Sequence, residues 1–269
     1  NRNLYIRLSP KPLRWHENGK GTAIVEGREG MTAIVTGAGA GIGRAIALRF
    51  AESGIAVALA GRRPAPLEDT ESQIRSRGGE ALSVTADVTD RTSVQDLVDR
   101  TVAEFGRVDV LVNNAGINTP ERGLEDIPPE TWDQVIQVNL TGSFNCIRAL
   151  LPRMKEQRGG LIINIASMCA KRAHVISGAA YSASKFGMVS LAQSVNEELR
   201  EIGIRACVIY PGEVETPILE SRPTAPSRRK LDVMLQADDI ASAALMVALM
   251  PDRAIVEEIT VFPRQVVEA

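Results

Sequence analysis

Residues 31–50, with the sequence MTAIVTGAGAGIGRAIALRF, constrain the fold more than any other stretch of the chain. The apolar run at residues 31–36 predicts a buried strand. Four glycines come next, Gly37, Gly39, Gly41 and Gly43. From Ile42 to residue 50, apolar residues recur with the spacing of a helix. A strand, a glycine turn and a helix in this order set bare backbone N–H groups beside a helix N-terminus, which suits a pyrophosphate.

The glycine turn by itself leaves two interpretations open. It does not fit the strict Gly-x-Gly-x-x-Gly fingerprint, because the sixth position is Ile42 or Arg44, depending on the first glycine chosen. What fits is Thr36-Gly37-x-x-x-Gly41-x-Gly43. Such a turn is compatible with phosphate binding and equally with a plain tight turn, so the rest of the chain has to decide.

Composition excludes several classes of function. The 269 residues carry a net charge of −2, so no basic surface for nucleic acid or for an anionic membrane is expected. No apolar run is long enough to span a bilayer. Cys146, Cys169 and Cys207 show neither metal-ligand spacing nor an even disulfide framework. That usage favours a reducing compartment, and we expect a cytoplasmic protein without a bound metal.

Residues 1–30 differ from the rest of the chain. They contain prolines and glycines without helical or alternating periodicity, and they lack the apolar core of a secretory signal. We expect a loosely ordered N-terminal extension, or sequence upstream of a natural start at Met31; the alternative is an arm docked on the protein. Residues 31–263 show no linker and no change of composition, so residues 31–269 are predicted to form one domain.

Apolar runs and helical segments alternate from residue 31 onward. Strands are expected at residues 31–36, 55–60, 81–86, 108–112, 161–165, 204–210 and 255–262. Helices are expected at residues 42–50, 64–77, 90–105, 128–157 with an interruption near 141–142, 181–202 and 238–250. This alternation predicts an α/β domain with a doubly wound parallel sheet of seven strands and right-handed crossovers.

Glycine and polar residues follow six of the predicted strands. They are the glycine turn, then Arg62 and Arg63, then Asp87 and Val88, then Asn113, Ala115 and Gly116, then Ser167, and finally Pro211 and Gly212. Each of these alone is ordinary turn chemistry. In a doubly wound sheet, however, the carboxyl ends of the strands meet at one rim, where ligands bind. Their coincidence predicts a ligand site along this rim.

The residues after the second strand indicate which dinucleotide the site would take. An acidic residue about 20 positions beyond the glycine turn would bind the ribose 2′-hydroxyl of NAD. Here that place holds Arg62 and Arg63, and no carboxylate occurs before Glu68. Two guanidinium groups suit the 2′-phosphate of NADP, so NADP(H) is favoured and NAD(H) is the alternative.

Tyr181 and Lys185 carry the predicted chemistry. On a helix their i, i+4 spacing sets the phenol and the ammonium on one face. A lysine cation, together with the positive nicotinamide of an oxidised dinucleotide, would lower the tyrosine pKa from its ordinary value near 10. The phenol would then exchange a proton with a carbonyl or alcohol oxygen, to which Ser167 also hydrogen-bonds. A tyrosine four residues before a lysine is also common on helix surfaces, where it has no catalytic role. Beside a dinucleotide site, the catalytic interpretation is favoured.

From residue 31 to about residue 263 the chain resembles the short-chain dehydrogenase/reductase family. The matching motifs are TGAGAGIG at 36–43, ADV at 86–88, NNAG at 113–116, VNLTG at 138–142, IASM at 165–168, YSASK at 181–185 and PGEVET at 211–216. The resemblance implies a Rossmann-type fold and NAD(P)-dependent oxidoreduction of a carbonyl/alcohol pair. It also implies a homo-oligomer, a dimer or tetramer, assembled through residues 128–157 and 181–202.

The resemblance assigns a role to each matching position. It implies that Tyr181 is the acid/base, that Lys185 lowers the tyrosine pKa and holds the nicotinamide ribose, and that Ser167 orients the substrate oxygen. Asn139 would anchor a water in a proton relay through Lys185. The implied cofactor contacts are Asp87 and Val88 with the adenine, residues 113–116 flanking the cofactor, and Val214 and Thr216 with the carboxamide.

Two features depart from the family pattern. Ala166 precedes Ser167, where the family often has serine or glycine, and Ser167 lies fourteen residues before Tyr181. Ser177 is a weaker candidate for the same role. No chemical role is expected for Cys169 or His174.

Residues 217–236 are the expected substrate lid. Arg222, Arg228, Arg229 and Lys230 would attract an acidic substrate or an acyl carrier partner, as in the similar 3-oxoacyl carrier-protein reductases, or would form a solvated lid. We expect reversible hydride transfer between NADP(H) and a small-molecule carbonyl/alcohol pair. The alternatives are an NAD-linked alcohol or sugar dehydrogenase and a non-catalytic dinucleotide-binding regulator. The complete set of Asn139, Ser167, Tyr181 and Lys185 argues against the regulator.

Overall fold

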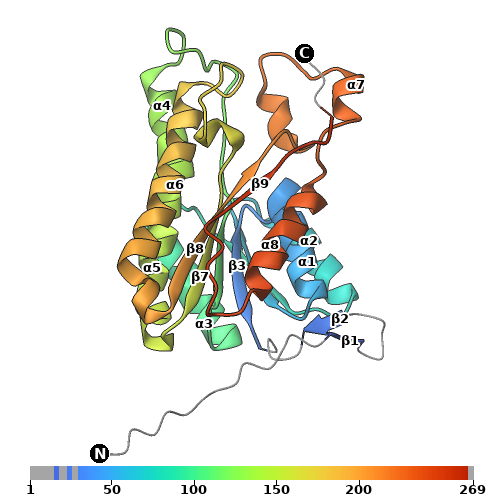
Figure 1. Cartoon of the computed structure of the whole chain (residues 1–269), viewed down its shortest axis with the longest axis vertical. Coiled ribbons are helices and arrows are strands. Elements are labelled where there is room, and N and C mark those ends of the chain that lie inside the picture. The colour runs from blue at the N-terminus through green and yellow to red at the C-terminus, as the bar shows by residue number, and fades with distance from the viewer. Residues whose placement is uncertain (1–14, 18–22, 26–29, 266–269) are drawn as a thin grey trace, which may run out of the picture.

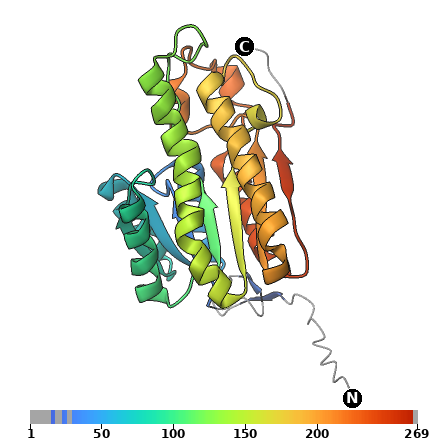
Figure 2. The same ribbon diagram turned by 90° about the vertical axis from the view of Figure 1, so that its left-hand side faces the viewer.

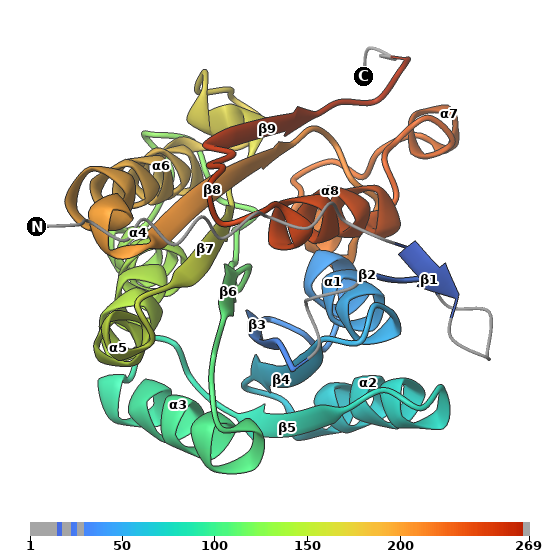
Figure 3. The ribbon, with the colours of Figure 1, turned by 60° about the horizontal axis from the view of Figure 1, so that its bottom comes forward.

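Seven parallel strands form one sheet in the order β5-β4-β3-β6-β7-β8-β9 (Figure 3). The computed structural model describes residues 15–17, 23–25 and 30–265 of the chain. The strands are β3 Thr32–Thr36, β4 Ala56–Gly61, β5 Ala81–Thr85, β6 Val110–Asn113, β7 Gly160–Ile165, β8 Ile204–Pro211 and β9 Glu258–Val261. Strand order reverses direction at β3, whose neighbours are β4 and β6. The predicted doubly wound sheet is confirmed, and its switch point lies between β3 and β6.

Helices cover both faces of the sheet (Figures 1 and 3). One face carries α1 Gly41–Glu52, α2 Pro64–Ser76 and α8 Ala237–Leu249. The other carries α3 Arg91–Phe105, α4 Pro129–Ile136, α5 Gly142–Gln157 and α6 Ala179–Leu199. On that face α4–α5 and α6 run side by side along the whole length of the sheet (Figure 2).

Two hydrophobic clusters fill the spaces between sheet and helices. Phe50 and Ile46 of α1 belong to one cluster, whereas Leu150 of α5 and Leu97 of α3 belong to the other. All residues of β3 and β6 are buried, because the strands have helices on both sides. That environment explains why the strands read as continuous Ala, Val, Ile and Leu runs rather than as alternating patterns.

The long helix predicted over residues 128–157 is divided by a π-helical segment, Gln137–Thr141. A π turn adds one residue to the helical ladder, and such turns are frequent at functional sites. Within it lies Asn139, whose main-chain carbonyl accepts a hydrogen bond of 2.8 Å from Ser143 Oγ. The predicted interruption near residues 141–142 is therefore present as this π-helical segment, which ends at residue 141.

Part of the N-terminal segment forms regular structure. β1 Trp15–Glu17 pairs antiparallel with β2 Ala23–Val25, although no alternating pattern of apolar residues predicts strands there. The rest of the expected extension lies outside the described residues, apart from Gly30. At the other end, β9 is shorter than predicted, because only residues 258–261 pair with β8 at this edge of the sheet. Among the helices of the described residues, none has the length and apolar character that a membrane crossing needs.

Candidate active site

A cavity of about 1190 Å³ lies outside the carboxyl ends of the parallel strands. Its lining comes from the segments that follow β3, β4, β5, β6, β7 and β8, and from α6. Segments that are far apart in the sequence therefore meet at one rim, as the doubly wound topology requires. The sequence-predicted residues that line it are Gly37, Gly39, Gly41, Ile42, Arg62, Arg63, Asp87, Val88, Ala115, Gly116, Ser167, Tyr181, Lys185, Pro211, Gly212, Val214 and Thr216.

The glycine turn packs too tightly for side chains. A Cβ on Gly43 would lie 2.4 Å from the carbonyl oxygen of Gly37 and 2.4 Å from Asn114 Nδ2. Gly37 itself has a positive φ of 67°, in the left-handed region that glycine adopts without strain. Gly43 does not line the cavity; its missing side chain lets α1 approach the turn.

The N-terminus of α1 opens into the cavity. Its N-cap residue is Ala40, which has no side chain to accept from the first-turn N–H groups, and no acidic residue lies in that turn. Ala40, Gly41 and Ile42 all line the cavity. The positive end of the helix and its N–H groups therefore face the cavity, and these residues fit a pyrophosphate of a dinucleotide.

A hydrogen-bond network fixes the turn against the end of β6. Thr36 Oγ1 donates to the carbonyl of Val112 and accepts from the N–H groups of Asn114 and Ala115, each at 3.0 Å. Asn114 Nδ2 donates to the carbonyl of Thr36 at 2.9 Å. Sequence reasoning had placed Asn114 only within the motif at 113–116; it proves to be the side chain that joins the motif to the glycine turn.

The far end of the cavity carries Arg62, Arg63 and Asp87. The two arginines are exposed at the start of α2. Asp87 Oδ1 accepts hydrogen bonds from the N–H and the hydroxyl of Thr89, at 2.9 and 2.8 Å. The Thr89 N–H lowers the pKa of Asp87, aided by the Thr89 hydroxyl and the charge of Arg62, while burial opposes this. The end is therefore rich in positive charge with one fixed carboxylate.

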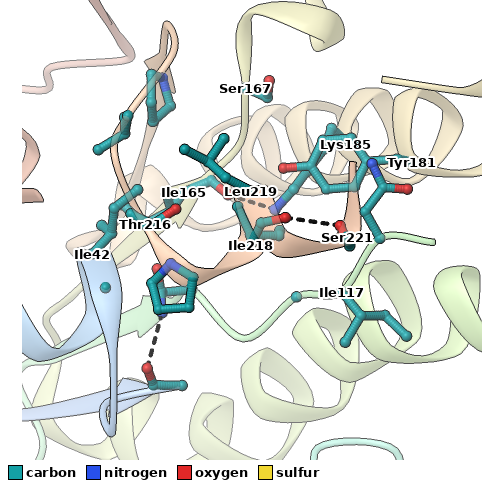
Figure 4. Close-up of a pocket in the computed structure, with 18 of the residues that line it drawn as sticks. Ile42, Ile117, Ile165, Ser167, Tyr181, Lys185, Thr216, Ile218, Leu219 and Ser221 are labelled. Atoms are coloured by element: carbon teal, nitrogen blue, oxygen red, sulfur yellow. Dashed lines mark hydrogen bonds between the residues drawn. The ribbon is translucent and has the colours of Figure 1, made fainter. Parts of the chain in front are cut away.

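Tyr181 and Lys185 project into the cavity from the first turns of α6 (Figure 4). The Lys185 ammonium lies 5.5 Å from the centre of the Tyr181 ring. Nζ of Lys185 donates to the carbonyl of Ile165 at 2.7 Å and lies 3.3 Å from the sulfur of Met188. Two turns of α6 and the end of β7 thus fix the predicted pair on one face, as the i, i+4 spacing requires.

Burial shifts the pKa of both groups toward their neutral forms. It lowers the pKa of Lys185 to about 8, which the neighbouring Cys169 opposes. It raises the pKa of Tyr181 above its ordinary value, as does Cys169, while the charge of Arg122 opposes the rise. The protein groups alone therefore leave the pKa of Tyr181 raised, contrary to the lowering expected from Lys185; that expectation also invoked the positive nicotinamide of a bound dinucleotide.

Lys185→Met should remove a pH dependence of stability. Burial holds the pKa of Lys185 at about 8 in the folded protein, against an ordinary 10.5. Between these values the unfolded chain binds the extra proton, so the free energy of unfolding rises with pH in this window. Between pH 7 and pH 9.5 we expect the free energy of unfolding of wild type to rise by about 2 kcal/mol relative to that of Lys185→Met, as measured in urea titrations.

The matched control for this titration is Lys155→Met, because Lys155 is exposed on α5. This control should follow wild type at both pH values. Parallel pH dependence of wild type and Lys185→Met would contradict a depressed lysine pKa.

Ser167 lies above the Tyr181–Lys185 pair in the close-up, at the end of β7 (Figure 4). Its side chain caps the 3₁₀ turn Met168–Ala170 by accepting from the N–H of Cys169 at 3.3 Å. Ser167 also lines the cavity, and its hydroxyl hydrogen remains free to donate, because a serine hydroxyl both accepts and donates. Ser177, the weaker candidate, also lines the cavity.

Three predicted residues do not line the cavity. Asn113 is buried, and its Nδ2 donates to Asn164 Oδ1 at 2.9 Å between β6 and β7. Asn139 is fully buried: Oδ1 accepts from the N–H of Ile117 at 2.8 Å, and Nδ2 donates to the carbonyl of Ile117 and to Ser184 Oγ, each at 3.0 Å. Together with Gly43, they hold the walls of the site rather than face its ligand.

Part of the positive charge of the lid is neutralised by a carboxylate at its base. Glu213 forms ion pairs with Arg222 at 2.9 Å and with Lys230 at 3.1 Å. Backbone hydrogen bonds from Leu235 to Glu213 and from Glu215 to Leu235 close the base of the lid. Two of the four basic residues assigned to an acidic partner are therefore occupied, and the two exposed ones, Arg228 and Arg229, lie on α7 Arg228–Leu231.

One buried residue of the cavity escaped the sequence analysis. Arg122 lines it from the loop between β6 and α4 and is 6% exposed. Arginine in a loop is usually solvated, and neither spacing nor a motif distinguishes this one from its neighbours. Only the fold reveals its position.

The family model described as short chain dehydrogenase matches residues 31–226. The chain belongs to this family. The protein is therefore an oxidoreductase, and its cavity brings together the glycine turn and the Tyr181–Lys185 pair.

Similar proteins span nearly the same length as this dehydrogenase. The 3-oxoacyl-[acyl-carrier-protein] reductase of Thermotoga maritima is 35% identical over 82% of this chain and 91% of its own. A metagenomic short-chain oxidoreductase solved in complex with NADP is 35% identical, with a TM-score of 0.76 and coverage of 88% and 98%. The 3-ketoacyl-(acyl-carrier-protein) reductase of Brucella melitensis, solved with NADH, is 32% identical, with a TM-score of 0.77 and coverage of 86% and 97%.

Proposed function

We propose that this short-chain dehydrogenase interconverts a carbonyl compound and its alcohol with NADP(H). The observation that carries the proposal is a single cavity lined at one end by Tyr181, Lys185 and Ser167 and at the other by the glycine turn, Arg62 and Arg63. A dinucleotide-binding surface and an acid/base group in one cavity are what such a reaction needs. A regulator that only bound the dinucleotide would not need the second set.

The dinucleotide fits the residues of the cavity from end to end. The turn at Gly37–Gly43 and the uncapped start of α1 would bind the pyrophosphate, and Arg62 and Arg63 the 2′-phosphate. Asp87 and Val88 would contact the adenine, and Val214 and Thr216 the carboxamide. When bound, the nicotinamide supplies the hydride donor or acceptor.

The chain's own residues would handle the proton. Tyr181 would donate its phenolic proton to the carbonyl oxygen during reduction and accept it back during oxidation. Ser167 would donate a hydrogen bond to the same oxygen, which fixes the substrate and stabilises the charge that develops there. Lys185 would hold the nicotinamide ribose and keep a positive charge near the phenol. Asn139, bonded to Ile117 and Ser184, would hold the cavity wall in place and, as proposed from the family, anchor a relay water.

NADP(H) is favoured over NAD(H) because no carboxylate precedes Glu68 at the end of β4, where Arg62 and Arg63 stand. The metagenomic relative solved with NADP supports this choice. The Brucella relative solved with NADH keeps the NAD-linked alcohol or sugar dehydrogenase as the alternative. The acyl-carrier-protein reductases of Thermotoga and Brucella named above support a 3-oxoacyl-type ketone as the first substrate to test.

The test is a titration of NADPH and NADH into wild type and into the double variant Arg62→Ala/Arg63→Ala. We expect wild type to bind NADPH more tightly. Loss of two charge-assisted contacts should weaken NADPH binding by about 10–100-fold. NADH binding should change by less than about 3-fold, because NADH has no 2′-phosphate. Arg77→Ala, at the other end of α2, is the matched control.

Turnover is then followed as the loss of NADPH absorbance with a panel of ketones that includes a 3-oxoacyl thioester. Tighter binding of NADH by wild type would overturn the role of the arginine pair. Failure to bind either nucleotide would overturn the whole proposal. Tight binding without turnover of any ketone would favour the non-catalytic regulator.

We further propose a homo-oligomer, a dimer or tetramer, located in the cytoplasm. Its interface would use the adjacent α4–α5 and α6 (Figure 2). Phe144 on α5 and Phe186 on α6 support this, because both are more than 40% exposed on that face, where a large apolar side chain gains free energy by burial.

A further inference from the structure

Arg122 is a buried cation at the substrate end of the cavity. It lies in the loop between β6 and α4, is 6% exposed and lines the cavity. Among the ion pairs of the described residues, none pairs Arg122 with a carboxylate. A buried guanidinium is costly unless its N–H groups and charge are compensated, so its surroundings have to supply that compensation.

Three loop segments receive its hydrogen bonds. Nε donates to the carbonyl of Thr119 in its own loop at 2.6 Å. Nη1 donates to the carbonyl of Ile176 at 2.7 Å, in the loop between the 3₁₀ turn after β7 and α6. Nη2 donates to the carbonyl of Ser221 and, at 3.4 Å, to its hydroxyl, at the end of the 3₁₀ turn Pro217–Ser221 in the lid.

The main chain of Arg122 makes a further contact with the second loop. Its carbonyl accepts from the N–H of Ala179 at 3.3 Å, at the first residue of α6. A Cβ on Gly178 would lie 2.5 Å from the Cβ of Arg122, so the two backbones meet closely. All three segments gather at the same end of the sheet (Figures 1 and 2). Arg122 therefore connects the three segments close to the start of α6, two residues before Tyr181.

The positive charge of Arg122 also acts on Tyr181. Tyr181 is faced by Lys185 on its own helix, by Cys169 from the 3₁₀ turn after β7, and by Arg122. Burial lowers the pKa of Arg122, as does the like charge of Arg222 in the lid, whereas an ionised Tyr181 would raise it. Arg122 also lines the same cavity as Tyr181, and its carbonyl is bonded to Ala179, two positions before Tyr181. Arginine remains charged in proteins even when buried, so Arg122 places a permanent cation in the cavity that the phenol lines.

We propose that Arg122 is a positioning residue that holds the lid at 217–222 and the loop at 171–178 together over the substrate end and places a fixed positive charge near Tyr181. Its five N–H donors on a planar group suit three carbonyls arriving from different directions, which a lysine cannot match. The role in the reaction rests on the function proposed above; the joining of the loops does not.

The structural arm of the test is hydrogen–deuterium exchange of Arg122→Gln and Arg122→Lys. Both variants lose the planar, five-donor guanidinium, so the amides of residues 171–179 and 218–222 should exchange at least 10-fold faster in both. Amides of α1 should be unchanged. Arg153→Gln, an exposed arginine of α5, is the matched control. Unchanged exchange in both loops, or a change confined to residues 114–128, would overturn the proposal.

The kinetic arm separates charge from geometry. Arg122→Gln should raise the apparent pKa for alcohol oxidation and raise the ketone KM about 10-fold. Arg122→Lys should raise KM similarly but keep the wild-type pH profile, because the cation remains. NADPH affinity should stay within 3-fold of wild type. A purely structural residue would leave the pH profile of the reaction unchanged. Equal pH profiles of wild type and Arg122→Gln would therefore overturn the electrostatic role.

If Arg122→Gln does not fold, two other variants still test the proposal. Arg122→Lys retains the buried charge, and Gly178→Ala pushes the second loop away from Arg122 without removing the guanidinium. Faster amide exchange at residues 218–222 in Gly178→Ala would support the connection between the loops, and faster exchange limited to residues near 178 would contradict it. Hydrogen–deuterium exchange needs no turnover. A protein without activity would therefore refute the proposed function, while the exchange data would still decide whether Arg122 joins the two loops.

Discussion

Tyr181→Phe should lower kcat/KM for ketone reduction by about 10²–10⁴-fold. In the reaction proposed above the phenol is the acid that protonates the substrate oxygen, and phenylalanine fills the same space without a proton to transfer. Because only the hydroxyl is lost, NADPH affinity should stay within about 3-fold of wild type, and thermal unfolding should change little. Steady-state kinetics, nucleotide titration and calorimetry on one preparation would measure the three effects.

Tyr210→Phe is the matched control for this variant. Tyr210 is buried, and its hydroxyl donates to Glu258 at 2.9 Å, between β8 and β9 and outside the cavity lining. Its loss should cost about 1 kcal/mol of stability and leave the rate intact. A Tyr181→Phe protein with a rate near that of wild type would exclude the phenol as the acid/base.

Gly43→Ala should have the second largest effect, on dinucleotide binding. A Cβ there would lie 2.4 Å from the main-chain oxygen of Gly37, which cannot move away without moving the turn. It would also displace Asn114 Nδ2 from the carbonyl of Thr36. We expect NADPH affinity to fall by at least about 10-fold and stability by about 1–3 kcal/mol, measured by titration and by urea unfolding.

Gly159→Ala provides the matched control, since the nearest atom to its added Cβ is the Gly203 oxygen at 3.9 Å. Gly159 precedes β7 at the opposite end of the sheet from the cavity. This variant should bind NADPH like wild type. If Gly43→Ala also did so, the tight packing of α1 against the turn would not matter for binding.

Much of the site could be read from sequence because its residues act through local geometry. The strand, glycine turn and start of α1 are continuous in the chain, and Tyr181 and Lys185 share one helix face. Local spacing could not tell which residues face the cavity. Asn113 and Ala115 are two positions apart in one motif, yet Asn113 turns toward β7 and Ala115 lines the cavity.

The lid shows why charge in a sequence is a weak guide to partners. Arg222 and Lys230 appeared free to attract an acidic ligand, but Glu213 lies between them and pairs with both. The carboxylate is nine positions from one cation and seventeen from the other, and no helical or strand periodicity connects such separations. Only the folding of the lid back onto its own base shows that they meet.

By itself the sequence determined the order of strands and helices, the parallel sheet and the position of its ligand rim, because apolar periodicity and chain direction fix these. Tertiary structure alone decided how the segments beyond the strand ends contact one another. The role of Arg122 depends on carbonyls of Ile176 and Ser221, 54 and 99 residues away. Main-chain carbonyls are the same in every residue, so no sequence pattern marks the ones that receive a hydrogen bond.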